Sequence, residues 1–134
     1  MARVLLDTQF LLRAALDRPE LPEATRALLL DPRLEPLFSA ASIWEVAVKS
    51  ALGRPDLAVD PEGLARGLAG AGYAELPVTS RHAAAARALP SPGPDSHRDP
   101  FDRLLVAQAR AEAVDPATAD RTLAGHGRGL VAMR

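Results

Sequence analysis

The chain has 134 residues, with 16 basic and 17 acidic side chains and a formal net charge of -1. A chain of this length forms one compact domain, and a composition that is 48% hydrophobic and 25% charged excludes a disordered or collagen-like protein. Because the charges balance, the protein has no overall positive charge that would bind nucleic acid nonspecifically. Binding of nucleic acid would need a local basic patch. Because the chain has no cysteine, thiolate catalysis and thiolate metal sites are excluded, and any metal must be bound by oxygen or imidazole.

We expect a single domain over residues 1–134, located in the cytoplasm. The first apolar run, Val4-Leu5-Leu6, ends at Asp7. A membrane-spanning helix needs about 20 consecutive apolar residues, and a signal peptide needs a longer apolar segment than this run. The sequence therefore predicts neither.

Hydrophobic periodicity and turn residues predict strands that alternate with helices. In chain order, the expected elements are a strand at 4–6, helices at 10–15 and 22–30, a weak strand at 36–39, helices at 40–52 and 61–68, a strand at 73–78, a helix at 80–89, a loop at 90–96, a helix at 100–113, a strand at 114–117, a short helix near 123–124 and a last strand at 130–132. Strands separated by helices of about ten residues pair in parallel, so the pattern predicts a mainly parallel sheet with helices on both faces.

The helix over 40–52 has an apolar face that we expect to pack against the core. Its members are Ile43, Trp44, Ala47, Val48 and Ala51. Trp44 is the largest of them and is expected to be buried. Glu45 lies at the edge of this face and Lys49 follows four residues later, a spacing typical of a surface ion pair. Taken alone, Glu45 is explained by that pair.

Three acidic residues lie close to the ends of predicted strands. Asp7 follows the first strand, Asp120 follows the strand at 114–117, and the helix that carries Glu45 begins after the strand at 36–39. Ligands of open parallel sheets bind outside the carboxyl ends of the strands, so these acids are expected to converge on one edge. Asp7 and Asp120 each have a second interpretation, as the N-cap of the helix that follows.

The segment His97-Arg98-Asp99-Pro100-Phe101-Asp102-Arg103 begins the longest predicted helix. Asp99 suits the N-cap and Pro100 suits the first helical position. Asp102 is different, because the residues at helical spacing from it are apolar: Leu105, Val106 and Ala109. A carboxylate on such a face needs a cation, since burying it unpaired costs several kcal/mol.

Taken together, the acids predict a metal site. Four carboxylates at one sheet edge, with no lysine or cysteine expected nearby, would repel one another unless a divalent cation lay among them. Oxygen ligands favour Mg²⁺ or Mn²⁺, and these ions support the hydrolysis of phosphodiester bonds. The three histidines, His82, His97 and His126, are expected in loops or on the surface rather than as metal ligands.

Four motifs occur in an order shared with a known family. They are Leu5-Leu6-Asp7-Thr8; Ser39-x-x-Ser42-x-Trp44-Glu45-x-Ala47-x-Lys49; the segment from His97 to Arg103, continued by Leu104-Leu105-x-Ala107-Gln108-Ala109; and Thr118-Ala119-Asp120. Over nearly its whole length, the chain resembles the PIN-domain nucleases and, within them, the VapC-type toxins of bacterial toxin–antitoxin pairs. The segment from His97 to Arg103 is the most specific of these motifs.

The resemblance implies a three-layer α/β/α sandwich with a mainly parallel sheet and the activity of a metal-dependent endoribonuclease. The catalytic acids that would surround Mg²⁺ or Mn²⁺ are matched by Asp7, Glu45, Asp102 and Asp120, and a neighbouring acid by Asp99. Residues that would orient the carboxylates or the metal-bound waters are matched by Thr8, Ser42 and Thr118. The expected RNA contacts are Arg98, Arg103 and Lys49.

The resemblance also implies partners. Members of the family are usually dimers and are inhibited by a small antitoxin, whose C-terminal segment lies across the active-site groove. The first two helices are expected to offer a partner exposed apolar surface. Its members would be Phe10, Leu11, Leu12, Leu28, Leu29 and Leu30.

Two departures from the family pattern matter. Gln9 stands where many relatives have histidine. The strand before Thr118 reads Val114-Asp115-Pro116-Ala117, although aspartate and proline are poor strand formers. This departure leaves open an alternative, a PIN fold with weakened catalysis that serves as a protein-binding module. A haloacid-dehalogenase-like phosphatase would need aspartate at position 9, and a response-regulator receiver would need a lysine after a late strand, so both are disfavoured.

Overall fold

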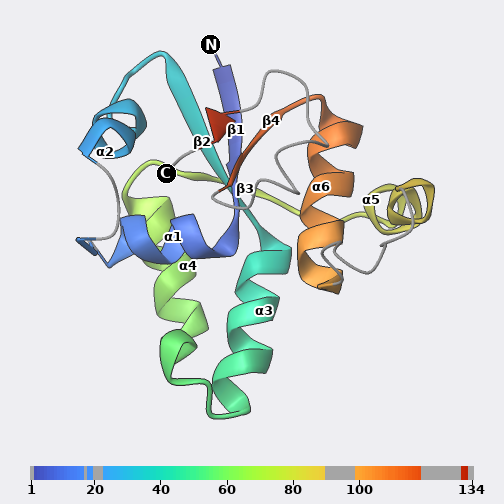
Figure 1. Ribbon diagram of the computed structural model, residues 1–134, viewed down its shortest axis with the longest axis horizontal. Helices are drawn as coiled ribbons and strands as arrows, with labels where there is room; N and C mark the ends of the chain where they lie inside the picture. Colours follow the sequence, from blue (N-terminus) through green and yellow to red (C-terminus); the bar gives the residue numbers. More distant parts are fainter. Residues whose placement is uncertain (1, 17, 20–22, 90–98, 119–130, 133–134) are drawn as a thin grey trace.

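The computed structural model describes residues 2–16, 18–19, 23–89, 99–118 and 131–132. Its helices are α1 (Thr8–Ala15), α2 (Glu23–Leu29), α3 (Ala40–Ala51), α4 (Pro61–Gly70), α5 (Ser80–Ala85) and α6 (Pro100–Glu112), with short 3₁₀ helices η1 (Pro55–Leu57) and η2 (Ala86–Ala88). Its strands are β1 (Ala2–Leu6), β2 (Leu34–Ser39), β3 (Ala74–Leu76), β4 (Asp115–Thr118) and β5 (Val131–Ala132) (Figure 1). None of the described helices is long and apolar enough to cross a membrane.

The predicted helices and strands are present wherever the chain is described, with ends that shift by a few residues. The loop expected at 90–96 and the helix expected near 123–124 lie outside the described residues. The five strands form one sheet in the order β3-β2-β1-β4-β5, and each neighbouring pair is parallel. The prediction of a mainly parallel sheet is confirmed.

β4 forms in spite of its unfavourable sequence. Asp115 pairs with Val4, Pro116 with Leu5, and the next residue with Leu6, so the register is continuous along β1. A proline removes only its own N–H donor from a ladder, and the flanking pairs keep the strand in place. The departure at Asp115 and Pro116 therefore changes the composition of the strand and leaves its pairing with β1 intact.

Alternation along the central strand divides the core into two apolar layers. Val4 and Leu6 of β1 pack in the cluster formed with α1, α3 and α4, whereas Leu5 packs on the opposite face with α6. Figure 1 shows the same division, with α1, α2 and α4 on one side of the sheet, α5 and α6 on the other, and α3 continuing from the carboxyl end of β2. The predicted α/β/α arrangement is confirmed.

α3 turns a different face to the core from the one that its apolar residues predict. The side chains of Ala41, Ser42, Glu45 and Val46 are buried, whereas Trp44 is 63% exposed. The prediction of a buried Trp44 is wrong. The physical reason is that α3 lies at the carboxyl edge of the sheet, where its inner face makes polar contacts that a tryptophan cannot make.

A buried polar network joins α5 and α6 to the end of β2. The Ser39 hydroxyl donates to Oε1 of Gln108, whose Nε2 lies 3.4 Å from Nδ1 of His82. Nδ1 of His82 accepts from the Thr79 N–H at 3.1 Å, so Nε2 carries the proton and donates to Oε2 of Glu112 at 2.9 Å. His82 is only 2% exposed. The expectation that it lies in a loop or on the surface is wrong, because this network satisfies both ring nitrogens inside the fold.

The first two helices expose less apolar surface than expected. Phe10, Leu11 and Leu12 are buried in the core on the α1 side of the sheet, which corrects the prediction that they form a docking surface. Leu30, just after α2, is 79% exposed, and Leu29 is partly buried. The core takes the α1 residues because α1 packs directly beside β1 and α4.

Candidate active site

The candidate site lies at the carboxyl end of the sheet, where the chain connections diverge. β1 is followed by Asp7 and α1, β2 is followed directly by α3, and β4 ends at Thr118. β2 and β4 flank β1 on opposite sides, so the connections on the two sides of β1 run in different directions. Parallel sheets bind ligands at such a point. The topology therefore brings Asp7 and the first turns of α3 to one edge.

Asp7 connects β1 to the first helix. Its Oδ1 accepts the backbone N–H of Phe10 at 2.9 Å, which is the N-cap bond of α1. The N-cap interpretation of Asp7 is thus confirmed. A cap also fixes the carboxylate in one orientation at the strand end, so the structural role and a role in binding a cation are compatible.

Glu45 is held by neighbours from two helices. Only 4% of the residue is exposed. The Thr8 hydroxyl donates to Oε1 of Glu45 at 2.6 Å and lies 3.0 Å from the hydroxyl oxygen of Ser42. Thr8 and Ser42 are themselves buried. A buried carboxylate is stable only when such donors compensate its charge, so Thr8 positions Glu45 directly.

Lys49 lies between two carboxylates. Its Nζ donates to Oε2 of Glu45 at 2.7 Å and to Oδ2 of Asp99 at 3.2 Å, and it lies 5.6 Å from the centre of the Phe101 ring. Partial burial works to lower the pKa of Lys49, but the hydrogen bonds to Glu45 and Asp99 outweigh it and raise the pKa above its usual value. The expectation that no lysine lies near the acids is wrong. The local pair with Glu45 was foreseeable from the spacing, whereas the contact with Asp99 crosses 50 positions of the chain.

Asp99 uses both of its oxygens inside the protein. Oδ1 accepts the backbone N–H of Phe101 at 2.8 Å, and Oδ2 accepts from Lys49. The first bond is the N-cap of α6, and Pro100 occupies the first helical position as predicted. These contacts make Asp99 the N-cap of α6 and a partner of Lys49.

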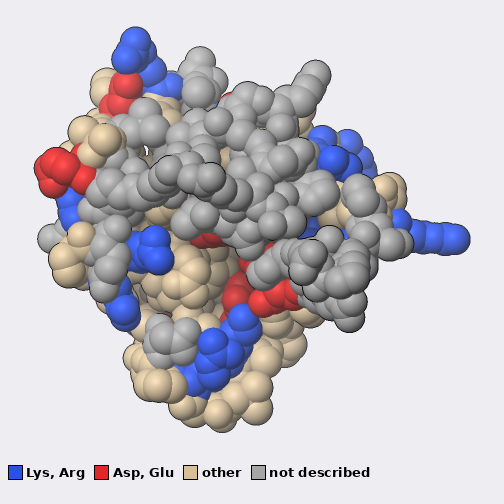
Figure 2. Space-filling view, in the orientation of Figure 1, with Lys and Arg blue, Asp and Glu red and all other residues tan. Residues whose placement is uncertain are grey.

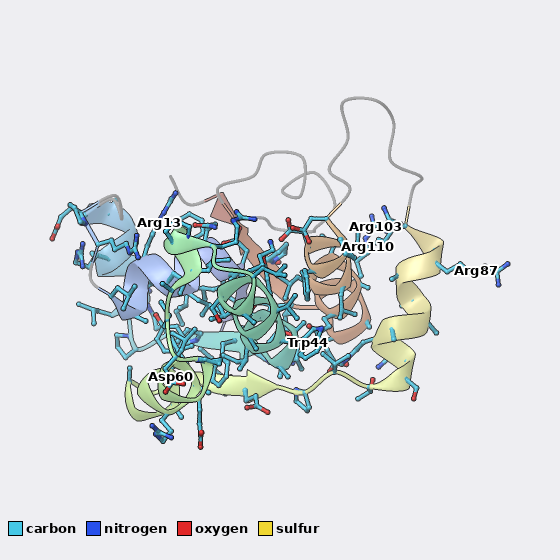
Figure 3. All side chains as sticks on the ribbon, turned by 90° about the horizontal axis from the view of Figure 1, so that it is seen from below. Arg13, Trp44, Asp60, Arg87, Arg103 and Arg110 are labelled. Atoms are coloured by element: carbon cyan, nitrogen blue, oxygen red, sulfur yellow. The ribbon has the colours of Figure 1, made fainter. Side chains whose placement is uncertain are left out.

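Asp102 and Arg103 lie in the first turn of α6, and both are partly buried. Nη2 of Arg103 donates to the backbone carbonyl of Ala86 at 3.2 Å. Figure 3 shows Arg103 and Arg110 on the side of α6 that faces α5, whereas Arg87 points away from the fold. The start of α6 carries Asp102, one of the predicted site acids, and, next to it, a cation held against η2.

Three of the predicted site residues have no described side chain. Asp120 and Arg98 lie outside the described residues, and Thr118 is described only as the last residue of β4. Within the part of the chain that is described, no three histidine, aspartate or glutamate side chains form a group that could hold a metal ion. The fourth predicted acid would have to complete the set.

The chemistry of the described donors nevertheless suits a hard divalent cation. Asp7, Glu45 and Asp102 offer only carboxylate oxygens, which are the ligands that Mg²⁺ and Mn²⁺ prefer. Figure 2 shows acidic atoms gathered in the middle of one face, between α1, α3 and the beginning of α6, with basic atoms beside them. Carboxylate oxygens gathered in this way could hold such a cation.

A separate apolar pocket of about 620 Å³ lies among α1, α2 and α4. Its larger lining side chains are Leu16, Leu29, Leu30, Leu64, Leu68 and Tyr73, and its charged ones are Arg26 and Asp60. Leu16 and Leu30 are exposed leucines at its edge. An apolar pocket with a charged rim is typical of a surface that binds an apolar segment of a partner.

Comparison with known proteins gives one family and several structural relatives. A family model described as PIN domain matches residues 4–128. No curated protein matches the chain. Similar solved structures include VapBC2 from Rickettsia felis bound to a DNA fragment from its promoter, FitAcB from Neisseria gonorrhoeae, and VapBC-1 from nontypeable Haemophilus influenzae.

The three structures share the fold at low sequence identity. The identities are 13%, 22% and 17%, and the TM-scores are 0.59, 0.59 and 0.55. The alignments cover 96%, 92% and 92% of this chain and 96%, 91% and 91% of theirs. They agree with the α/β/α fold derived from the strand order.

Proposed function

Because this chain belongs to the PIN-domain family, we propose that it is a metal-dependent endoribonuclease and the toxin of a type II toxin–antitoxin pair. The observation that carries the proposal is the buried carboxylate of Glu45. Thr8 and Lys49 hold it at the sheet edge that also carries Asp7. A fold gains no stability from burying a carboxylate that must then be compensated, so its retention there supports a role in chemistry.

Asp7, Glu45 and Asp102, with Asp120 as the fourth acid, are the residues that would hold Mg²⁺ or Mn²⁺. Such an ion supplies charge stabilisation and an activated water for the hydrolysis of a phosphodiester bond. Thr8 keeps the Glu45 carboxylate from rotating, and the α1 cap does the same for Asp7. The protein's own contribution is thus a set of oxygen ligands whose orientation is fixed by bonds outside the set.

RNA is the proposed substrate, and Arg103 is its proposed phosphate contact. It adjoins Asp102 in the sequence and is anchored to η2 through the carbonyl of Ala86. The net charge of -1 makes this contact local. Lys49 is not proposed as an RNA contact, because Glu45 and Asp99 already engage its ammonium group.

The experiment that tests the nuclease proposal is a cleavage assay on single-stranded RNA with Mg²⁺, Mn²⁺ or a chelator. The full chain should cut RNA with either metal and stop with the chelator. Glu45→Gln should abolish cleavage, whereas Glu62→Gln, at an exposed acid of α4, should leave it unchanged. A folded protein that cuts no RNA with either metal would refute the proposal and favour the alternative of a PIN fold that serves as a protein-binding module.

The proposed inhibitor is a small antitoxin, and the apolar pocket among α1, α2 and α4 is its proposed docking site. The apolar lining of the pocket suits an apolar helix. The names of two similar structures, VapBC2 and VapBC-1, join two proteins, VapB and VapC, which supports a partner protein for this chain as well. The test uses as its probe a small protein encoded directly beside this chain, if a search of the neighbouring sequence finds one. Leu30→Glu should prevent its co-purification, and Leu52→Glu, at an equally exposed leucine outside the pocket, should not. Equal co-purification of both variants would exclude the pocket, and mass measurement of the free chain tests the expected homodimer.

A further inference from the structure

Lys49 is the only lysine in the chain, and it is fixed in the candidate site from three directions. Glu45 on its own helix, Asp99 at the start of α6 and the face of the Phe101 ring all approach its ammonium group. Only 19% of its side chain is exposed. An ammonium held by two carboxylates and an aromatic ring has little freedom to leave.

The position of this ammonium matters because two-metal hydrolases place two cations about 3.5–4 Å apart on shared carboxylates. Glu45 is the carboxylate that Lys49 contacts in this site, and its two oxygens have different partners. Oε1 faces Thr8 and the α1 side, where Asp7 lies, whereas Oε2 faces Lys49 and Asp99. The position on the α6 side of Glu45 is therefore already taken by a cation.

We infer that Lys49 acts as the second cation of the site, so that this protein binds a single divalent ion. The inference rests on the proposed function and specifies its metal content. A divalent ion between Glu45 and Asp99 would need the place of the Lys49 ammonium group, and the positive charge of that group repels the ion. Lys49 is then a positioning residue, since it orients Glu45, and Asp99 serves to hold Lys49.

The test counts Mn²⁺ ions bound per chain, by electron paramagnetic resonance of the free ion in equilibrium with the full-length protein. The unmodified chain should bind one ion. Lys49→Met frees Glu45 and Asp99 and should bind two, whereas Lys49→Arg keeps the charge and should bind one. Arg66→Met removes a cation from an exposed pair with the same four-residue spacing, Glu62–Arg66, and should also bind one.

Two ions on the unmodified chain would overturn the inference and leave the nuclease proposal standing. If Lys49→Met binds one ion with unchanged affinity, the inference is likewise overturned and the nuclease proposal still stands. If Lys49→Met fails to fold, Asp99→Asn decides, because asparagine keeps the α6 cap. That variant should still bind one ion with unchanged affinity, and weaker binding would make Asp99 a ligand and overturn the inference. Absence of any bound ion on the unmodified chain would overturn the proposed function itself, and this inference with it.

Discussion

Replacing Thr8 by valine removes one hydroxyl from the candidate site, and with it the contacts to Glu45 and Ser42. Valine has nearly the same shape as threonine and fits the buried position at the start of α1. The change takes away the donor that lies 2.6 Å from Oε1 of Glu45. That oxygen then stays buried with its hydrogen-bond donor lost, while Lys49 still holds Oε2.

The cost follows from the loss of a hydrogen bond to a charged, buried acceptor. Such bonds contribute about 1.5–3 kcal/mol, and we expect Thr8→Val to lower the free energy of unfolding by about 2 kcal/mol. For a domain of this length, each kcal/mol shifts the Tm by about 3–5 °C, so the Tm should fall by about 6–10 °C. Cleavage should fall as well, because Glu45 loses one of the two bonds that orient it.

Urea unfolding at neutral pH and a thermal melt measure the stability change. Thr8→Ser is the matched control, because serine keeps the hydroxyl and should retain most of the stability and the cleavage rate. A Thr8→Val protein within about 0.5 kcal/mol of the unmodified chain would refute the reasoning, since it would mean that Oε1 is not compensated mainly by Thr8.

Two further predictions concern other acids of the chain. Asparagine caps helices nearly as well as aspartate, so Asp7→Asn should not unfold the protein, and neither should Asp102→Asn. Each substitution removes a proposed metal ligand. Each should therefore lower RNA cleavage by more than roughly 100-fold, which is the effect of losing a residue that only supports a metal ligand. The hydrogen bond from His82, together with the positive charge of Arg81, holds the pKa of Glu112 below its usual 4.5. The ionised Glu112 therefore stabilises the fold above pH 4.5, and this stabilisation is lost as the pH falls through the lowered pKa. Glu112→Gln should remove this acid sensitivity, which melting curves over a range of pH would show, and an unchanged pH profile would contradict it.

The elements of the fold were predictable from the sequence because each carries a local signal. Asp7 and Asp99 are N-caps, Pro100 is at the first helical position, and both caps are made by bonds within three residues. The order of strands and helices follows from apolar runs of the right length, and parallel pairing follows from the helices between them. Local chemistry decided these features, so the residues that specify them are neighbours in sequence.

The orientation of α3 was not predictable in the same way. Trp44 is more apolar than Glu45, and a pattern of hydrophobicity therefore turns the wrong face inward. What buries Glu45 is a hydroxyl 37 positions away on α1 and an ammonium group that also binds Asp99, 50 positions beyond it. The periodicity of apolar residues in a sequence does not predict bonds between residues so far apart in the chain. His82 is a similar case, since its burial depends on Gln108 and Glu112 of another helix.

Hydrogen bonds and helix caps connect the polar groups of the site, so a shift of one helix affects several of them. Thr8 links α1 to Glu45, Lys49 links Glu45 to Asp99, and Asp99 caps α6, whose first turn carries Asp102. A displacement of α6 therefore changes the position of Asp102 and the charge around Glu45 together. The sequence departure in β4 leaves the pairing of β4 with β1 continuous. Among the described residues, the contacts that join the site are those among α1, α3 and α6.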